Sequence, residues 1–539
     1  MTGRLTLTWA NKDHALLSHG ESGYEWVDRD DPRAREVRLL DEVGRVGDVT
    51  GDASDNFLIR GDSLDALRAL VHTPELAAEY RGKVKLVYID PPFNTGQAFE
   101  HYDDSLEHSV WLGMMRERLV LIKELLSPEG SVWVHLDDAE MAYCKVLMDE
   151  IFGRQNFVAT VIWEKTDSPR MDAQRFSSAH DSIVIFARTP LWAPNRHERD
   201  VDLKDFPHVD DQGRRYSRRE LRKWGSNSLR EDRPTLWYPI TAPDGSLAWP
   251  IRPDGREGYW RWKESQYQSR LDRIDWVERD GSLQPYVKSF ADDGKKPLPP
   301  KTLWPIGLVG GNPAARDELK ALFPGVEPFS TPKPERLLER VIHIGSSRGE
   351  IVLDCFAGSG TTAAVAQKMG RRWVTAELSE NTADTFTKPR LEKVVAGADP
   401  GGITESAHWT GGGGFRDLRI ESSTWQVLDS DTGLEVYRVE AVDGSTLRRA
   451  VAAQLGYALI KHPVFAGVRG RSRLAVVDGV VDATAVADIA AALAEGETAL
   501  VAGTSVTDDA QTALRDLNKG SRVLRIPRDL FPRTGAVTR

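Results

Sequence analysis

The apolar residues of the chain follow two patterns, short continuous runs and longer stretches with helical spacing. Residues 56–60 (NFLIR) and 84–89 (VKLVYI) are short runs rich in Val, Leu and Ile, which predicts buried strands. Residues 63–71 and 109–130 carry apolar side chains three and four positions apart, so both are predicted to contain helices. Strands that alternate with helices predict a mainly parallel α/β sheet.

The same alternation continues on both sides of an interruption. Before it, strands are predicted at GSVWVHLDD, NFVATVIWEK and HDSIVIFAR, and a helix at EMAYCKVLMDEIFG. After it, helices are predicted at PERLLERVIHIG and TTAAVAQKMG, and strands at GEIVLD and RWVTAEL. The pattern therefore predicts one sheet that is divided by an insert at residues 190–310.

The ends of the chain differ from this sheet. Residues 1–50 are charged and aperiodic, so we expect an N-terminal arm or an irregular cap, with ordered structure beginning at residue 56. The last part predicts a small βαβαβ unit with strands at RLAVVDG, TALVAGTSV and RVLRIP. The predicted domains are the arm 1–50, the first half of the sheet 51–189, the insert 190–310, the second half of the sheet 311–424, and a C-terminal α/β domain 425–539.

Composition agrees with a globular protein of several domains. The chain has 539 residues, of which 40% are apolar and 28% charged, and this length predicts two to four domains. No window approaches the roughly 18 apolar residues of a membrane span, and the first residues lack a secretory signal, so we expect a cytoplasmic protein. Cys144 and Cys355 have no nearby Cys or His at metal-ligand spacing, which favours buried apolar roles and no metal site.

Charge and aromatic residues set the insert apart. The net charge of the chain is −10, yet residues 190–310 hold 22 Lys and Arg against 19 Asp and Glu, which leaves −13 for the rest. The same segment contains eight of the 16 tryptophans. Its basic run comprises Arg214, Arg215, Arg218, Arg219, Arg222 and Lys223 and lies beside Trp224. A further basic residue, Arg261, lies between Trp260 and Trp262. Such residues grip phosphates and guanine edges, although a solvated face with a small Trp core would have the same composition.

A Gly-rich turn follows the predicted strand GEIVLD. It reads Asp354-Cys355-Phe356-Ala357-Gly358-Ser359-Gly360-Thr361 and opens a predicted helix. Glycines allow close approach of a ligand to the backbone, and the helix N-terminus offers unpaired N–H groups. The next strand ends at Glu377, whose carboxylate can bind ribose hydroxyls. A dinucleotide-binding oxidoreductase or an ordinary strand–helix turn would fit this loop alone.

A second motif, Asp90-Pro91-Pro92-Phe93, ends the strand VKLVYI. By itself it could be a capped turn, but it also suits a site that handles a nucleobase. The Asp90 carboxylate and a backbone carbonyl near Pro91 could accept both hydrogens of an exocyclic amino group, which would make its nitrogen a better nucleophile. Phe93 could stack on a base flipped out of a duplex.

Together, DPPF and FAGSG resemble the catalytic and S-adenosylmethionine motifs of amino-DNA methyltransferases. Their order, DPPF first, resembles the circularly permuted β class. Longer stretches within residues 55–425 resemble the modification subunits of type III restriction systems and their stand-alone relatives: VKLVYIDPPFNTG, FEHYDDSLEHSVWL, VLMDEIFGRQNFVATVIWEK, TPKPERLLERVI, VLDCFAGSGTT and GGGGFRDLRIE. Phe93 replaces the commoner Tyr of that family, which preserves stacking and loses only a phenol hydroxyl.

The resemblance implies a fold, a cofactor and a set of site residues. The fold would be a doubly wound methyltransferase sheet with the insert as target-recognition domain. The catalytic residues would be Asp90, Pro91, Pro92 and Phe93. The S-adenosylmethionine pocket would comprise Asp62, Asp90, Thr331, Lys333, Pro334, Asp354, Phe356, Ala357, Gly358, Ser359, Gly360, Thr361 and Glu377.

The resemblance also implies a reaction and partners. We expect methyl transfer to N6 of a flipped adenine in double-stranded DNA, in a restriction-modification or phage-defence system. A homodimer that can engage a restriction helicase-nuclease subunit is expected, with the C-terminal domain serving assembly. A domain that only packs against the sheet and stabilises its edge is the alternative.

Several other activities would fit parts of the sequence. N4-cytosine methylation is chemically close, but its enzymes more often have Ser where Asp90 stands. A C5-cytosine enzyme would need a thiolate, usually after a proline, and neither cysteine follows one. An RNA target is disfavoured because no RNA-binding module is visible. A non-catalytic DNA-recognition subunit would be expected to have lost Asp90 or the glycines, and a nicotinamide oxidoreductase is the most distant alternative.

Overall fold

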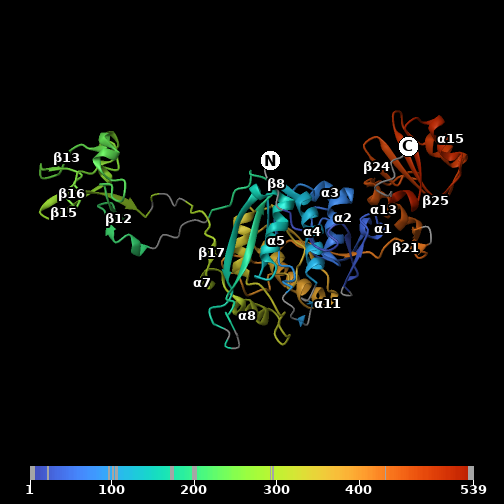
Figure 1. Cartoon of the computed structure of the whole chain (residues 1–539), viewed down its shortest axis with the longest axis horizontal. Helices are drawn as coiled ribbons and strands as arrows, with labels where there is room; N and C mark the ends of the chain where they lie inside the picture. The colour runs from blue at the N-terminus through green and yellow to red at the C-terminus, as the bar shows by residue number, and fades with distance from the viewer. Residues whose placement is uncertain are drawn as a thin grey trace. The chain divides into compact units, whose positions relative to one another are not determined.

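The computed structural model describes residues 6–531 except 21–22, 95–97, 100–101, 104–106, 170, 172–174, 197–202, 292, 294–296 and 431–432. Parts of the NTGQ and FEHYDDS stretches that carry the family resemblance therefore lie outside the described residues, as do the first five residues of the expected arm. The chain forms two units, Met1–Asn195 with Lys301–Arg539, and Arg196–Pro300 (Figure 1).

A ten-stranded sheet runs through the larger unit in the order β17-β9-β10-β8-β5-β18-β19-β4-β20-β3. Its central strands are parallel neighbours: β8 (Leu126–Leu136), β5 (Val84–Ile89), β18 (Ile351–Asp354), β19 (Arg372–Glu377) and β4 (Asn56–Arg60). Strands from both sides of the insert thus join one sheet, as the sequence pattern predicted. The two motif-bearing strands, β5 and β18, lie next to each other.

The outer strands make the sheet mixed. On one side β10 (His180–Ala187) is antiparallel to β8 and β9 (Phe157–Glu164), and β17 (Leu303–Trp304) is parallel to β9. On the other side β20 (Gly414–Ile420) is parallel to β4 and antiparallel to β3 (Leu40–Gly47).

The expectation that ordered structure begins at residue 56 is wrong. Strand β3 belongs to the ten-stranded sheet, and two further strands precede it, β1 (Ala15–Ser18) and β2 (Tyr24–Val27). Side chains along β3 alternate between partly buried and exposed, as expected for an edge strand with one wet face. Its buried face carries few large apolar residues, which is why the hydrophobic pattern missed it.

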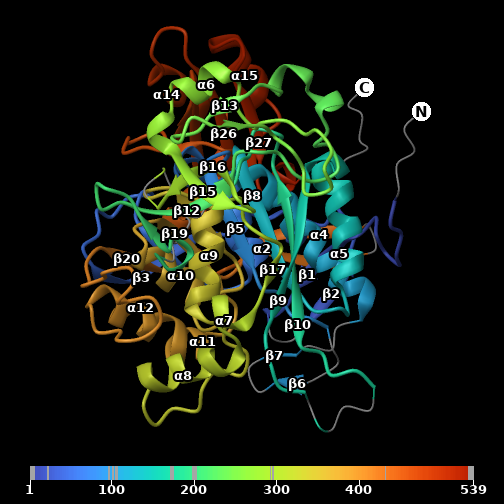
Figure 2. The ribbon, with the colours of Figure 1, turned by 90° about the vertical axis from the view of Figure 1, so that its left-hand side faces the viewer.

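Helices cover both faces of the sheet (Figure 2). One face packs against α2 (Ser63–His72), α3 (Pro74–Tyr80), α4 (His108–Leu125) and α5 (Met141–Met148). The other packs against α9 (Glu335–Gly345), α10 (Thr361–Lys368) and α12 (Lys388–Val395). Along β5, Val87 and Ile89 face the first core while Leu86 and Tyr88 face the second, which explains why this strand reads as a continuous apolar run.

The C-terminal region of the larger unit has a sheet of its own. Strands β25 (Ser472–Val481), β26 (Thr498–Val506) and β27 (Arg522–Arg525) are parallel, with α14 (Ala483–Ala491) and α15 (Ala510–Leu517) between them. This confirms the predicted βαβαβ order. Two short antiparallel strands, β23 (Ala458–Leu459) and β24 (Gly467–Arg469), extend the sheet, and α13 (Gly444–Leu455) precedes them.

The second unit lies inside the segment for which we predict a recognition domain. It contains a four-stranded antiparallel sheet of β11 (His208–Val209), β12 (Arg215–Glu220), β16 (Ser282–Phe290) and β15 (Ile274–Arg279). A short hairpin pairs β13 (Ile240–Thr241) with β14 (Leu247–Ala248). Its core contains Leu221, Tyr238 and Trp260, and Trp262 and Trp276 pack against it.

The structure also bears on the two cysteines and on whether a helix could span a membrane. Both cysteines are buried, and burial raises the pKa of each thiol, which confirms the predicted apolar role. Within the described ranges, no helix is both long enough and apolar enough to cross a bilayer.

Candidate active site

The C-terminal ends of β5, β18, β19 and β4 border a cleft of about 890 Å³. Most residues predicted for the site line this cleft: Asp62, Asp90, Pro91, Pro92, Phe93, Thr331, Lys333, Asp354, Phe356, Ala357, Gly358, Ser359, Thr361 and Glu377. Pro334 and Gly360 are not among the lining residues. Pro334 is the N-cap of α9 and Gly360 the N-cap of α10, so both shape the segments that do line it.

The DPPF segment leaves β5 with its polar atoms held in specific contacts. Asp90 Oδ2 accepts a hydrogen bond from Lys333 Nζ, whereas the buried Oδ1 has no hydrogen-bond partner among the described residues. The Pro92 carbonyl accepts a hydrogen bond from Trp111 Nε1 at 2.7 Å. Asp90 therefore offers one unused acceptor at the end of its strand.

The Phe93 ring rests on a polar group that the sequence analysis did not identify. His135, at the end of β8, stacks on Phe93 with ring centroids 6.0 Å apart and an interplanar angle of 20°. His135 Nδ1 bonds the Tyr88 hydroxyl at 2.8 Å, and Asp181 Oδ2 lies 3.4 Å from Nε2. Asp181 Oδ1 in turn accepts from Lys165 Nζ at 2.7 Å. These contacts hold His135 in place, and His135 in turn supports the Phe93 ring that is predicted to stack on the base.

The charged groups around Asp181 keep its carboxyl ionised. Burial alone would raise the pKa of Asp181, but the hydrogen bond and charge of His135, together with Lys165 and Lys333, lower it to about 2. Tyr88, Asp181 and Lys165 all line the cleft. A histidine inside an apolar strand is usually a core residue, so His135 taken alone does not stand out in the sequence. The charged ends of HLDD and VIWEK were the available hint.

The FAGSG loop places a buried carboxyl beside β18. Asp354 Oδ1 accepts the Phe356 N–H at 3.0 Å. Burial raises the pKa of Asp354 to about 7, helped by the charges of Asp90 and Glu377, although hydrogen bonds from Thr362 and Phe356 oppose the rise. Asp354 is therefore poised between its neutral and charged forms near neutral pH.

The backbone of the same loop requires glycine at two positions. Gly358 and Gly360 have φ of 50° and 77°, a region that other residues rarely adopt. A Cβ on Gly358 would lie 3.3 Å from the Phe329 ring, and one on Gly360 would lie 3.1 Å from Thr387 Cγ2. The Gly358 N–H donates to Glu377 Oε2 at 2.8 Å, which ties the loop to the end of β19.

Asp62 lies at the end of the cleft beside β4 and α2. Its Oδ1 accepts hydrogen bonds from the Leu64 N–H at 2.7 Å and from Arg118 Nη2 at 2.8 Å. Burial would raise the pKa of Asp62, but the charge of Arg118 and several hydrogen bonds lower it. Tyr24, from the N-terminal segment expected to be an arm, also lines this end of the cleft.

The arrangement suits a ligand with many donors and positive charge. Following the sheet order, the carboxyl groups of Asp90, Asp354, Glu377 and Asp62 mark one side of the cleft from β5 to β4. The buried Ser330 Oγ, like Asp90 Oδ1, has no hydrogen-bond partner among the described residues. Such carboxylates would repel the pyrophosphate of a dinucleotide but could bind ribose hydroxyls and a cationic group.

The sequence of this region belongs to a known family. Residues 84–388, which include both motifs and the second unit, match the N6/N4 DNA methylase family, and the chain is a member of that family. The match begins at the first residue of β5 and ends at the first residue of α12.

Curated relatives extend the similarity beyond the family region. The StyLTI Mod subunit of a type III restriction-modification enzyme from Salmonella typhimurium is 28% identical over 426 residues, 70% of this chain and 62% of that protein. The EcoPI Mod subunit of Escherichia phage P1 is 28% identical over 359 residues, 58% of this chain and 54% of that protein. The type II methyltransferase M.KpnI of Klebsiella pneumoniae is 27% identical over 347 residues, 61% of this chain and 79% of that protein. The chain spans less than two thirds of the length of the Mod subunits.

Two solved structures are similar to parts of the chain. The cytosine-N4-specific PvuII DNA methyltransferase has a TM-score of 0.34 and 16% identity, over 65% of this chain and 90% of that one. The M1.HpyAVI complex with S-adenosylmethionine has a TM-score of 0.30 and 13% identity, over 62% of this chain and 98% of that one.

Proposed function

We propose that the protein is an S-adenosylmethionine-dependent DNA methyltransferase that methylates N6 of adenine in double-stranded DNA. The observation that carries this proposal is the meeting of DPPF and FAGSG at the ends of adjacent parallel strands, in one cleft. The order of the two motifs, DPPF before FAGSG, supports placing the chain in the β class.

The residues of the cleft suit the cofactor. Glu377, at the end of β19, would bind the ribose hydroxyls, and the Asp62 region beside β4 would lie near the adenine of the cofactor. Thr331 and Lys333 would contact the opposite part of the cofactor, and Gly358 would allow the backbone to approach it. S-adenosylmethionine, when bound, supplies an electrophilic methyl group on a sulfonium.

Asp90 prepares the target nitrogen. Its unpartnered Oδ1 accepts one N6 hydrogen, which draws the lone pair out of conjugation with the ring. The Pro92 carbonyl is engaged by Trp111, so the Pro91 carbonyl is assigned to the second hydrogen. After methylation, Asp90 receives the proton that N6 releases. Because both reacting groups are held in place, orientation supplies a large part of the rate enhancement, on the order of 7–11 kcal/mol for well-aligned groups.

Phe93 holds the flipped base. His135 supports its ring, and the Tyr88–His135–Asp181–Lys165 chain of contacts keeps His135 in position. A fixed aromatic surface lowers the entropic cost of stacking, so the base can be held in the geometry that methyl transfer requires.

The second unit is assigned to target recognition. In β12, Arg215 and Arg219 are exposed on the face opposite Tyr216, and neither forms an ion pair with a described residue. Arg214 and Arg218 are instead paired with Asp210 and Asp275. This division favours Arg215 and Arg219 as the phosphate contacts within the basic run. Trp260 is fully buried, so it belongs to the core of the unit.

The relatives named as Mod subunits support a role in a restriction-modification or phage-defence system. From the family resemblance described in the sequence analysis we also propose a homodimer, a cytoplasmic location and the capacity to engage a restriction helicase-nuclease subunit. The C-terminal region, 425–539, would serve assembly.

Product analysis tests the proposal. The purified protein is incubated with S-adenosylmethionine and unmodified duplex DNA, and the digested nucleosides are separated by mass spectrometry. N6-methyladenine is the expected product. N4-methylcytosine would instead support the alternative amino-methylation, and DNA binding without any methylated base would support a non-catalytic recognition subunit.

A further inference from the structure

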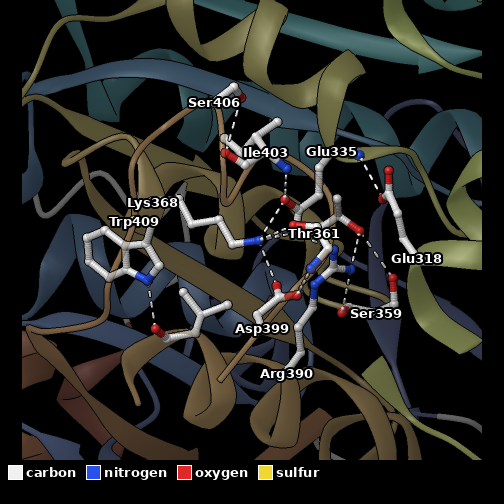
Figure 3. A network of polar contacts seen from close by, with 12 residues as sticks. Glu318, Glu335, Ser359, Thr361, Lys368, Arg390, Asp399, Ile403, Ser406 and Trp409 are labelled. Carbon is white, nitrogen blue, oxygen red and sulfur yellow. Dashed lines mark hydrogen bonds and ion pairs between the residues drawn. The ribbon is translucent and has the colours of Figure 1, made fainter. Parts of the chain in front are cut away.

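Behind the cleft, four charged side chains form a buried network (Figure 3). Lys368 Nζ donates to both Glu335 oxygens, at 2.9 and 2.7 Å, and to Asp399 Oδ2 at 2.7 Å. Arg390 Nη2 donates to Glu335 Oε1 at 2.8 Å. The four side chains are at most 5% exposed, and their formal charges balance.

Glu335 is the centre of this network and follows directly after the TPKP segment. Its Oε2 also accepts the Ile403 N–H at 2.9 Å, so donors from three other segments converge on one carboxylate. Its own N–H donates to Glu318 Oε2 at 3.0 Å, which anchors the first turn of α9. Glu335 therefore fixes the point at which the TPKP segment enters its helix.

The other end of the network reaches the cofactor loop. Arg390 Nη1 donates to Thr361 Oγ1 at 2.8 Å, and Thr361 Oγ1 lies 3.2 Å from Ser359 Oγ. Ser359 and Thr361 line the cleft, as does Lys333 two residues before Glu335. Through Arg390, Glu335 thus connects two walls of the cleft, the TPKP segment and the FAGSG loop.

The backbone at Gly402 packs closely against the Glu335 carboxylate. A Cβ on Gly402 would lie 2.0 Å from Glu335 Oε2, and Gly402 has a φ of 59°. The backbone of residues 401–403 therefore closes over the carboxylate, and glycine is needed for that approach. A side chain held on every side can transmit a change in its own position to both walls.

We propose that Glu335 is a positioning residue for methyl transfer, which sets the TPKP segment against the FAGSG loop. This inference rests on the proposed function. Loss of its charge would let the two walls separate and would change the place of Lys333, which contacts Asp90. The expected consequence is a weaker cofactor site with an unchanged affinity for DNA.

The simpler role for such a network is stability alone, because an unpaired buried charge destabilises any fold. A matched control distinguishes the two roles. Glu36 is also a buried glutamate, and it accepts the Thr424 N–H at 2.9 Å and the Ser423 hydroxyl at 2.6 Å. It does not line the cleft. Glu36→Gln should lower the melting temperature without changing the cofactor site.

The experiment measures the Kd for S-adenosylhomocysteine by calorimetry, together with KM for S-adenosylmethionine and for DNA. Wild type, Glu335→Gln, Glu335→Asp and Glu36→Gln are compared at a temperature at which circular dichroism shows each to be folded. Glu335→Gln should raise the Kd at least about tenfold and raise KM for S-adenosylmethionine alone. Glu335→Asp, which keeps the charge, should fall between Glu335→Gln and wild type, and Glu36→Gln should bind like wild type.

The outcomes separate the possible failures. If folded Glu335→Gln binds with the wild-type Kd, the positioning role is overturned and only a stabilising role remains. Should Glu335→Gln not fold, Glu335→Asp decides, because wild-type binding by that variant would overturn the inference. If wild type itself does not bind S-adenosylhomocysteine, the proposed function fails rather than the role of Glu335.

Discussion

We predict that Asp354 makes cofactor binding depend on pH. Its pKa is raised from 3.8 to about 7, chiefly by burial, so about one molecule in eleven is ionised at pH 6 and about ten in eleven at pH 8. A cationic ligand in the cleft stabilises the carboxylate. If S-adenosylmethionine binds only the ionised form, its apparent Kd equals the intrinsic Kd divided by the ionised fraction, so binding is about tenfold weaker at pH 6 than at pH 8.

The raised pKa of Asp354 also makes the stability of the folded protein depend on pH. A carboxyl whose pKa is raised in the folded protein stabilises it fully below its unfolded pKa, and that contribution is lost as pH rises through about 7. At about 1.4 kcal/mol for each tenfold change in proton affinity, the loss amounts to about 4 kcal/mol between pH 4 and pH 8. A bound cation reverses part of this loss, which is the physical reason for the pH-dependent affinity.

The assay is calorimetric titration of wild type and Asp354→Asn with S-adenosylmethionine between pH 6 and 8. The amino group of the ligand titrates near this range, so the comparison uses the ratio of the two Kd values at each pH. For wild type relative to Asp354→Asn, the affinity should rise about tenfold across the range. Parallel profiles for the two proteins would refute the assignment of the titration to Asp354.

Three further predictions concern the cofactor, the base and the DNA. Glu377→Ala should raise the Kd for S-adenosylhomocysteine by the value of lost charged hydrogen bonds, about 1.5–3 kcal/mol, and an unchanged calorimetric Kd would contradict the ribose role. Phe93→Ala should lower kcat while Phe93→Tyr preserves it, because only stacking is required; equal rates for both would count against it. Neutralising Arg215 and Arg219 should reduce the salt slope of DNA binding by about 0.9 for each lost phosphate contact, whereas Arg218→Ala serves as the paired-arginine control.

Those parts of the fold that depend on strong local patterns could be predicted. The apolar run of β5 and the Gly-rich turn after β18 gave the two motif-bearing strands, because buried parallel strands read as continuous apolar segments. Strand β3 could not be predicted, because its place depends on pairing with β20, about 370 residues later. Its own residues alternate too weakly to signal a strand.

The candidate site was predicted where motifs are contiguous and missed where packing creates it. Asp90 and Asp354 belong to motifs, but His135 and Asp181 meet only because β8 and β10 pair. In sequence, Glu335 and Lys368 look like ordinary charged residues on helix surfaces. The packing of α9 against α10 buries both, and no local pattern encodes that. The resemblance implies that Pro334 and Gly360 belong to the pocket, and in the structure they are the N-cap residues of α9 and α10, next to residues that line the cleft.

The central claim is that Asp90 activates an adenine amino group in the cleft that binds the cofactor. It is tested most directly by Asp90→Ala, measured for N6-methyladenine formation in duplex DNA and for binding of S-adenosylhomocysteine. The expected result is loss of methyl transfer in a folded protein that still binds the cofactor product and DNA. Full N6-adenine methylation by folded Asp90→Ala would contradict the claim.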